Sequence, residues 1–251
     1  MNTINILWTG GWDSTFRIVE LSKEEVEIQA YYVLDKTRKS QKNEIDTMKK
    51  ITEELEKNSN TKAKFLPIKF VNVDEIEKND EITRVYKKMH KIHKIGSQYD
   101  YLARLALKVK NLELGLENAE TSKALNFIKA CGEIQEKEIN GLKNYAINPE
   151  KSSYELKLLL GNLNFPIIDK TKLDMKNIAE KEGYSNIMNM TWFCHNPIDN
   201  KPCGYCNPCV STIQEGMQYR FTDEALERYK KRKKYRFVKK IKRGIEKICN
   251  K

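Results

Sequence analysis

The sequence predicts an α/β fold in which a doubly wound, mostly parallel β-sheet is followed by a cysteine-rich segment and a basic helical tail. Three observations lead to this prediction. Apolar runs of strand length alternate with amphipathic stretches over residues 1–190, a pattern typical of a parallel sheet with helices on both faces. Four of the six cysteines fall within residues 191–217, and Lys and Arg crowd residues 218–251. These three ranges are the expected domains.

Composition limits the class of protein. Hydrophobic residues make up 39% of the 251 residues, which is enough for a packed core and argues against wholesale disorder. No run of about 18 apolar residues occurs, so no membrane span is predicted. The chain opens directly on a strand pattern without a signal peptide, and we therefore expect a cytoplasmic location.

The net charge of +11 belongs to the C-terminal end of the chain. From Glu227 to Lys251, 13 Lys and Arg stand against two Glu, which accounts for the whole excess. Residues 1–226 are therefore neutral overall. This balance argues against a body that is basic all over and binds nucleic acid through its whole surface.

The first predicted strand–helix pair contains the main candidate binding loop. An apolar run from Ile4 to Trp8 meets Gly10 and Gly11, and a helical pattern follows from Phe16 to Leu21. A tight turn of this kind gathers backbone N–H groups at the positive end of a helix dipole, which suits phosphate. Glycines let the backbone approach an anion without an intervening Cβ. We therefore expect this loop to bind nucleotide phosphates.

The remaining elements follow from hydrophobic periodicity and from turn residues. Strands are predicted at residues 27–34, 64–73, 112–116 and 165–168, and Pro67 indicates an edge or a bend in the second of these. Helices are predicted at residues 44–55, 82–95, 97–110, 119–139 (one or two helices), 153–160 and 171–183. Thr171 and Asp174 form a capping pattern for the last helix. In such a sheet, ligands bind beyond the carboxyl ends of the strands.

Two histidines, His90 and His93, lie three residues apart on a predicted helix among several lysines. A solvated basic face is the favoured interpretation. A metal pair is the alternative, but no further ligand lies nearby in the sequence.

The cysteine cluster predicts a metal site. Cys194, Cys203, Cys206 and Cys209 offer four thiolates, and the two-residue gaps between the last three let their side chains surround one ion. Zinc is favoured, so residues 191–217 are interpreted as a structural zinc knuckle. An iron–sulfur centre and a redox dithiol are the alternatives. Cys131 and Cys249 lie apart from the cluster and are interpreted as ordinary residues.

Two motifs together resemble a known family. Residues 9–14 (Thr-Gly-Gly-Trp-Asp-Ser) resemble the PP-loop of N-type ATP pyrophosphatases. Residues 166–169 (Pro-Ile-Ile-Asp), Thr191-Trp192-Phe193-Cys194 and the run from Pro202 to Cys209 look like the C-terminal half of 7-cyano-7-deazaguanine synthases, which act in queuosine biosynthesis. The resemblance covers roughly residues 3 to 217.

The resemblance implies an adenine-nucleotide α-hydrolase-like fold that binds ATP, Mg²⁺ and one structural Zn²⁺. In the deazaguanine enzymes a substrate carboxylate is adenylated, pyrophosphate leaves, and ammonia then displaces AMP. By motif position, Asp13 organises the loop or the magnesium, and Lys172 neutralises charge or, alternatively, is a solvent-facing lysine. The expected nucleotide-binding residues are Thr9, Gly10, Gly11, Trp12, Asp13, Ser14 and Thr15.

The sequence also departs from that family. Thr9 replaces the usual serine, and the segments after the second strand and around Gly96 lack the family's Tyr-Gly-Gln-like and Gly-Arg-Asn stretches. Those segments shape the substrate pocket, so the fold and the ATP chemistry transfer better than the substrate does. Surface or packing residues are the alternative for each of the candidate substrate contacts, which are Arg38, Ser97, Gln98 and Arg104.

The basic tail, from Thr222 to Ile248, is predicted to form an amphipathic helix with one apolar stripe among Lys and Arg. Such a helix can lie on an anionic membrane surface, bind RNA, or pack on its own protein. Peripheral membrane association and RNA binding are therefore candidate roles of the tail, and a homodimer is a candidate assembly.

Three functions are compatible with these motifs. The first is an ATP-dependent carbon–nitrogen ligase that adenylates a small carboxylate such as 7-carboxy-7-deazaguanine for attack by ammonia. The second is a PP-loop relative that modifies tRNA or another acceptor. The third is a zinc-knuckle binding module with a non-catalytic loop, and the intact Gly-Gly-x-Asp-Ser run argues against it.

Overall fold

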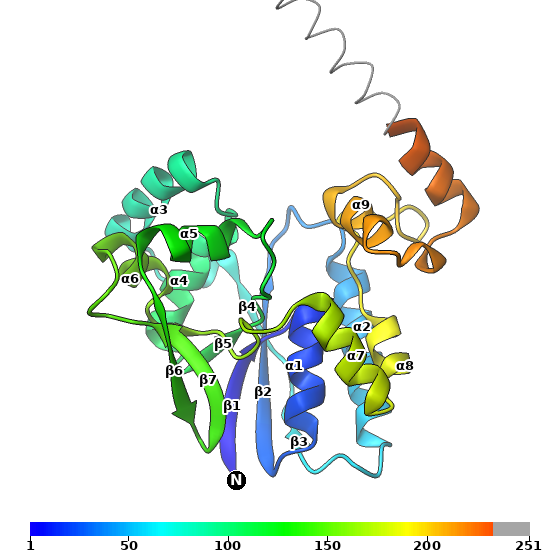
Figure 1. The fold of residues 1–251 in the computed structure, drawn as a ribbon, viewed down its shortest axis with the longest axis horizontal. Helices are drawn as coiled ribbons and strands as arrows, with labels where there is room; N and C mark the ends of the chain where they lie inside the picture. The colour runs from blue at the N-terminus through cyan, green and yellow to red at the C-terminus, as the bar shows by residue number, and fades with distance from the viewer. Residues whose placement is uncertain (233–251) are drawn as a thin grey trace, which may run out of the picture. The chain divides into compact units, whose positions relative to one another are not determined.

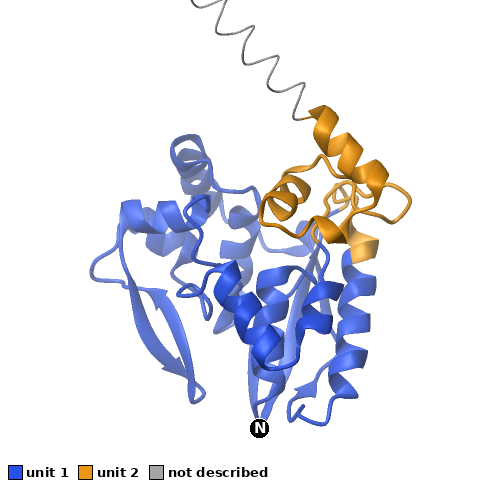
Figure 2. Cartoon of the chain, turned by 45° about the vertical axis from the view of Figure 1, so that its right-hand side comes forward, with its two compact units in different colours: residues 1–35, 44–192 blue, residues 36–43, 193–251 orange. Residues whose placement is uncertain are grey.

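The computed structural model describes residues 1–232 of the chain. Two compact units make up this part (Figure 2): unit 1 comprises residues 1–35 and 44–192, and unit 2 comprises residues 36–43 and the chain from Phe193 onward. The boundary at Phe193 lies close to the expected start of the cysteine-rich segment. The sequence had not indicated that residues 36–43 would belong with that segment.

Unit 1 is built on an eight-stranded sheet with the order β3-β2-β1-β5-β8-β7-β6, and β4 pairs with β2 beyond β3 (Figure 1). The pairs β1–β2, β1–β5, β2–β3, β2–β4 and β5–β8 are parallel, whereas β6–β7 and β7–β8 are antiparallel. The strands are β1 (Asn2–Leu7), β2 (Val26–Leu34), β3 (Lys64–Phe65), β4 (Lys69–Asn72), β5 (Leu112–Leu114), β6 (Ile134–Ile139), β7 (Leu142–Ile147) and β8 (Leu163–Asn164). The predicted mostly parallel sheet is confirmed.

Helices cover both faces of this sheet (Figure 1). They are α1 (Trp12–Ser22), α2 (Gln41–Glu56), α3 (Asp80–His93), α4 (Gln98–Lys108), α5 (Lys123–Cys131), α6 (Tyr154–Leu160), α7 (Lys172–Lys181) and α8 (Ser185–Met190). One buried cluster unites the apolar sides of α1, α2, α7 and α8, and a second unites those of α3 to α6. The doubly wound arrangement is confirmed.

The two clusters meet the sheet through the period-2 alternation of its central strands. On β1 and just after it, Ile4, Ile6 and Trp8 face the first cluster and Leu7 faces the second. Strand β2 alternates in the same way. Burial on both faces explains why these strands are nearly continuously apolar in the sequence.

A buried charged group links α1 to the middle of the sheet. Arg17 donates to both carboxylate oxygens of Glu113 on β5, at 2.8 and 2.9 Å, and the two residues are 6% and 1% exposed. Asn144 of β7 donates to the same carboxylate at 2.7 Å, and Arg17 also reaches Glu20 at 3.3 Å. Bidentate geometry and the additional hydrogen bonds compensate for taking these charges out of water.

The prediction of helix through residues 119–139 is wrong in its second half. Only α5 forms there, and β6 and β7 follow as an antiparallel hairpin. The turn is Asn140-Gly141, and both residues have positive φ, at 54° and 78°. Asn-Gly between alternating strands is a strong hairpin signal because both central residues of a type I′ turn require positive φ. The charged residues of β6 suited a solvent-facing helix equally well, and for that reason the turn was overlooked.

Two predicted strands are displaced or divided. The strand predicted at 64–73 is interrupted near Pro67, and its halves, β3 and β4, both pair with β2 at the edge of the sheet, as a proline there indicates. The strand predicted at 165–168 is wrong: β8 ends at Asn164, and Phe165 to Ile168 form a buried turn. The capping box of Thr171 and Asp174 at the start of α7 is confirmed.

Unit 2 contains the cysteine-rich segment, α9 (Asn207–Gln214) and a helix that runs from residue 223 to the last described residue, 232. Thr222 begins this helix, since its hydroxyl accepts from the Ala225 N–H at 3.4 Å. The rest of the predicted tail helix lies outside the described residues.

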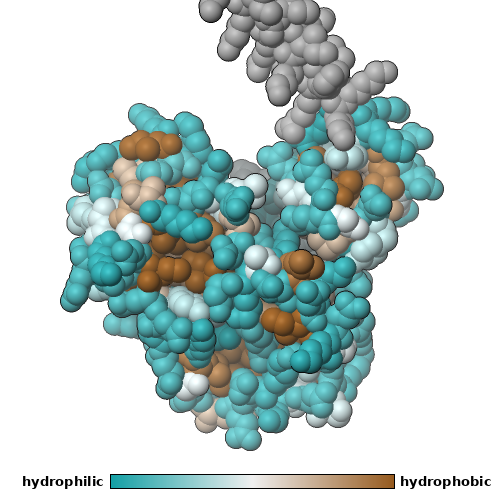
Figure 3. All heavy atoms as spheres, viewed as in Figure 1, coloured by the Kyte–Doolittle hydropathy of each residue, from teal (hydrophilic) through white to brown (hydrophobic). Residues whose placement is uncertain are grey.

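No helix within residues 1–232 combines the length and apolar character needed to cross a membrane. Figure 3 shows a largely hydrophilic face of the molecule with apolar side chains gathered below α5.

The Arg17–Glu113 pair leads to a stability prediction. Replacing Glu113→Ala leaves the Arg17 charge buried without its main partner, and the free energy of unfolding is expected to fall by about 3–5 kcal/mol. Urea denaturation measures this change. The matched control is Glu54→Ala, which removes the exposed Lys57–Glu54 pair and should cost about 0–1 kcal/mol. Similar losses in both variants would contradict a special role for the buried pair.

Candidate phosphate loop and metal centre

The candidate phosphate loop lies where β1 ends and α1 begins, at the carboxyl end of a central strand. Gly10 has φ of +67°, a conformation that side-chain-bearing residues rarely adopt. A Cβ at Gly10 would also lie 3.1 Å from Thr47 Cγ2 and 3.2 Å from the Glu44 carbonyl oxygen of α2. The positive φ favours glycine here, and the close approach of α2 leaves little space for a side chain.

Gly11 occupies the N-cap position of α1, where no side-chain hydrogen bond caps the helix. The first helical hydrogen bond runs from Thr15 N–H to the Gly11 carbonyl at 3.0 Å. The preceding N–H groups of the first turn, those of Trp12, Asp13 and Ser14, therefore mark the positive end of the helix dipole. An uncapped helix start after a glycine turn provides suitable donors for an anion.

The loop after β5 packs closely on this helix start. A Cβ added to Gly115 would lie 2.9 Å from the Ser14 nitrogen and 3.1 Å from the Asp13 carbonyl carbon. Any other residue would force the two backbones apart. Sequence analysis missed Gly115, although a glycine directly after a strand signals this kind of close approach.

A third segment reaches the loop from the end of unit 1. The Trp192 N–H donates to the Gly10 carbonyl at 2.7 Å, and Thr191, at 3% exposure, precedes it. Trp192, about 180 residues away in the sequence, is therefore in direct contact with the glycine loop.

Charged side chains also gather at this edge of the sheet. Lys172, the first residue of α7, forms an ion pair with Glu117 at 3.5 Å. Glu117 comes two residues after Gly115, so the pair belongs to the segments that flank the loop. Glu117 is a second residue that the sequence analysis did not identify.

The loop side chains differ in where they point. Thr15 is fully buried, and its hydroxyl accepts a hydrogen bond from the Trp8 indole N–H at 2.9 Å. This buried hydrogen bond joins the two ends of the loop. Trp12 packs against the core beside α1, and its indole nitrogen is buried. Its backbone N–H is therefore the donor that Trp12 contributes at the start of α1. Ser14 is 8% exposed, and Thr9 and Asp13 are half-buried.

The candidate substrate contacts have other surroundings. Arg104 pairs with Asp100 of the same helix at 2.9 Å and donates to the carbonyls of Ile76 and Glu77, so it is a packing residue that ties α4 to the segment before α3. Ser97 and Gln98 are exposed at the start of α4, and no hydrogen bond joins either to the loop in the described part of the chain. Arg38 lies within residues 36–43 and belongs to unit 2.

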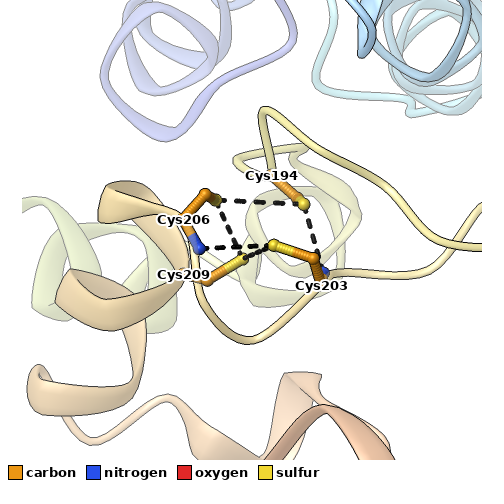
Figure 4. A group of neighbouring side chains, drawn as sticks. All are labelled: Cys194, Cys203, Cys206 and Cys209. Atoms are coloured by element: carbon orange, nitrogen blue, oxygen red, sulfur yellow. Dashed lines mark hydrogen bonds between the residues drawn. The ribbon is translucent and has the colours of Figure 1, made fainter. Parts of the chain in front are cut away.

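Unit 2 brings its four cysteines to one point (Figure 4). The sulfur atoms of Cys194, Cys203, Cys206 and Cys209 are buried and all lie within 4.8 Å of one another. Individual separations are 3.3 Å (Cys206–Cys209), 3.8 Å (Cys203–Cys209) and 4.0 Å (Cys194–Cys206). The four side chains point toward a common centre, and they can together hold a metal.

The backbone around the cysteines stabilises thiolates. The Cys203 N–H donates to the Cys194 sulfur at 3.2 Å, and the Tyr205 and Cys206 N–H groups donate to the Cys203 sulfur. Gly204 has φ of +79°, and a Cβ there would collide with the Ala225 carbonyl. The glycine of this turn therefore makes the knuckle possible.

The hydrogen bonds between the sulfurs shift the pKa values of two of the cysteines in opposite directions. Hydrogen bonding with Cys206 raises the pKa of Cys194 to about 12. The same contact with Cys194 lowers the pKa of Cys206 well below its usual range. A bound cation would displace the shared protons and be held by four thiolates.

The two histidines of α3 have no third ligand of the kind a metal needs. His90 donates through Nδ1 to the Ile95 carbonyl at 2.6 Å, and His93 lies 3.6 Å from the Cys131 sulfur and against the Phe127 ring. Among the described residues, the only group of three or more potential ligands is the cysteine cluster of unit 2.

Comparison with known proteins finds solved structures to which this chain is similar, and two of them are described here. One is the U34-tRNA thiolase NcsA of Methanococcus maripaludis with its [4Fe-4S] cluster: 14% identity, TM-score 0.42, 94% of this chain and 73% of that chain covered. The other is a predicted subunit of a tRNA methyltransferase from Methanocaldococcus jannaschii: 15% identity, TM-score 0.31, 76% and 93% covered. No protein-family model matches the chain, and neither does any curated protein.

Neither solved structure is described as a 7-cyano-7-deazaguanine synthase. The comparisons therefore give no support to that assignment, which stays a prediction from the sequence motifs. At these similarities they also do not assign an activity to the chain.

The cysteine geometry generates a metal-binding prediction. The purified chain is expected to hold one metal centre, and Cys206→Ser should release it because one of four thiolates is lost. Elemental analysis and thermal unfolding measure the two consequences, loss of metal and a lower melting temperature of unit 2. Cys131→Ser is the control, since Cys131 lies outside the cluster. Unchanged metal content in the Cys206 variant would disprove the site.

Proposed function

We propose that this chain is an ATP-dependent adenylating enzyme of the PP-loop type. The supporting observation is the glycine loop at the uncapped start of α1, where Gly10 and Gly115 let three backbone segments meet around the N–H groups of Trp12, Asp13 and Ser14. Such a site binds phosphate through main-chain donors. The motif resemblance selects ATP among phosphate ligands and cleavage between its α- and β-phosphates among reactions.

The proposed reaction has two steps. An acceptor oxygen attacks the α-phosphorus of ATP, the bond to the bridging oxygen breaks, and pyrophosphate leaves. A nitrogen nucleophile, ammonia in the carboxylate case, then attacks the activated carbon, and AMP leaves with the former acceptor oxygen. Adenylation is needed because a carboxylate or amide oxygen is a poor leaving group. The protein contributes positioning and charge neutralisation.

Residues at the loop divide these tasks. The first-turn N–H groups would stabilise the phosphate charge, and the Asp13 carboxylate would hold Mg²⁺, for which carboxylate oxygens are suitable ligands. Lys172 lies beside Glu117 and would exchange this partner for the departing pyrophosphate. Thr15 and Trp8 maintain the loop from inside the core.

Zinc fits the cysteine cluster better than an iron–sulfur cluster does. Four sulfurs bound to one Zn²⁺ at about 2.3 Å are roughly 3.8 Å apart in a tetrahedron, and the observed sulfurs lie within 4.8 Å of one another. A four-iron cluster places several metal atoms between its thiolates and requires wider spacing. A closed shell of four thiolates makes the zinc structural. We therefore expect zinc and no iron in elemental analysis.

Two acceptors are compatible with this chemistry. The motif resemblance favours a small carboxylate such as 7-carboxy-7-deazaguanine, and the main proposal is a carbon–nitrogen ligase acting on it. A base oxygen of tRNA is the second candidate, and the exposed lysines of α3 favour it. Release of AMP in the presence of each acceptor distinguishes the two.

The function is tested on the loop itself. Asp13→Ala should lower ATP-dependent pyrophosphate release at least 100-fold, since removing an electrostatic contact to a reacting phosphate costs about two to three orders of magnitude. Asp46→Ala changes an exposed carboxylate on α2 and should leave the rate unchanged. Pyrophosphate release is measured with the candidate acceptors present. A chain that binds no ATP at all would exclude the proposal.

A further inference from the structure

Helix α3 carries two opposite surfaces. Its apolar side is 0–4% exposed and packs into the second core cluster; it comprises Ile82, Val85 and Met89. Its outer side is exposed and basic; it comprises Arg84, Lys87, Lys88 and Lys91. The basic side chains recur at i, i+3, i+4 and i+7, so they form one row that is about 10 Å long. We call this row the α3 basic face.

Little negative charge opposes the α3 basic face. No acidic residue occurs between Ile82 and Tyr99. Arg84 reaches Glu81 only at 3.9 Å. Lys88 pairs with Glu155 at 2.8 Å, with side chains that are 59% and 26% exposed, and solvent weakens such a pair. Within the described residues, Lys87 and Lys91 form no ion pair and no side-chain hydrogen bond. The row therefore presents at least two uncompensated cations.

An aromatic pair borders the same face. The rings of Tyr86 and His90 lie 5.6 Å apart, and His90 is exposed. The His90 ring is held in place because its Nδ1 donates to the Ile95 carbonyl at 2.6 Å. A fixed, exposed ring next to a row of lysines offers a stacking surface for an unpaired base.

We propose that the α3 basic face, with Tyr86 and His90 beside it, is a docking site for single-stranded RNA. The lysines contact backbone phosphates, and the exposed imidazole stacks on an unpaired base. This partner requires both the lysines and the His90 ring. Lysines alone would bind any polyanion, whereas the exposed ring favours a strand whose bases are unstacked.

Other anionic partners fit this face less well. A membrane surface requires apolar side chains that can enter it, yet the apolar side of α3 is buried and Ile92 is the single large apolar residue exposed on the helix. A compact anion requires donors that converge. Here a shallow hollow along α3 is lined by the same row of side chains, together with Asp80, Thr83 and Ile92, so the cations are spread out along a line, as a polymer backbone requires.

This inference rests on the proposed function in one respect: it concerns the second acceptor named there, a base oxygen of RNA, and leaves adenylation of a small carboxylate unaffected. An unpaired base carries carbonyl oxygens that can attack the α-phosphate. Docking itself needs no nucleotide, so binding and catalysis can be measured separately, and the failure of one leaves the other open.

The test measures binding of the full chain to a fluorescent tRNA-sized stem-loop RNA, without ATP, at several salt concentrations. Lys87→Glu/Lys91→Glu should weaken binding at least tenfold and reduce the slope of log K against log salt by about two, one per lysine removed. His90→Ala, measured at pH 8, should weaken binding about tenfold with an unchanged slope, since stacking carries no counterion release.

Lys49→Glu/Lys50→Glu is the matched control, because these two lysines are exposed on α2 of the same unit and carry the same charge change. Circular dichroism verifies that each variant is folded. Selective loss in the α3 variants supports the proposal. An equal loss in the α2 control, or no loss in the α3 double variant, overturns it. Equal affinity for duplex DNA, or α3-dependent binding to vesicles of phosphatidylserine and phosphatidylcholine in equal parts, also overturns the assignment to single-stranded RNA.

Discussion

The candidate phosphate site depends on how closely its backbone segments approach one another. At Gly10 a Cβ would lie tightly against Thr47 and Glu44, and at Gly115 there is no room for one against Ser14. A side chain at Gly10 would press against α2, and one at Gly115 would push the loop after β5 away from the start of α1. The buried Arg17–Glu113 pair joins the same helix to the same strand two residues before Gly115. A bidentate buried pair tolerates little movement, so α1 is held in the register that the close approach requires.

The two candidate sites use different chemistry and lie in different units. Unit 1 presents backbone N–H groups and a helix dipole, which suit an anion that must enter and leave. Unit 2 presents four buried sulfurs with hydrogen bonds from neighbouring N–H groups, which suit a cation that stays. The first arrangement suits the ATP site proposed above, and the second suits the structural metal proposed above.

Net charge hides the local charge pattern of unit 1. Residues 1–226 are neutral overall, yet α3 gathers its cations on one side because its apolar residues must occupy the other. Because α3 buries its apolar side, its basic residues lie together on the exposed side, although residues 1–226 are neutral overall. Such a surface becomes visible only when the helix, its buried side and the neighbouring acidic groups are known together.

The sequence by itself determined the alternation of strands and helices, the glycine turn at residues 10 and 11 and the cysteine spacing, because each depends on residues close together in the chain. The Asn140-Gly141 hairpin was equally local, but charged β6 residues resembled an exposed helix. Only the tertiary structure decided that Gly115 and Trp192 contact the loop, that Glu117 pairs with Lys172, that Thr15 points into the core, and that Arg104 is a packing residue. These contacts join segments up to about 180 residues apart, and their geometry is set by sheet order and by the packing of helices on it.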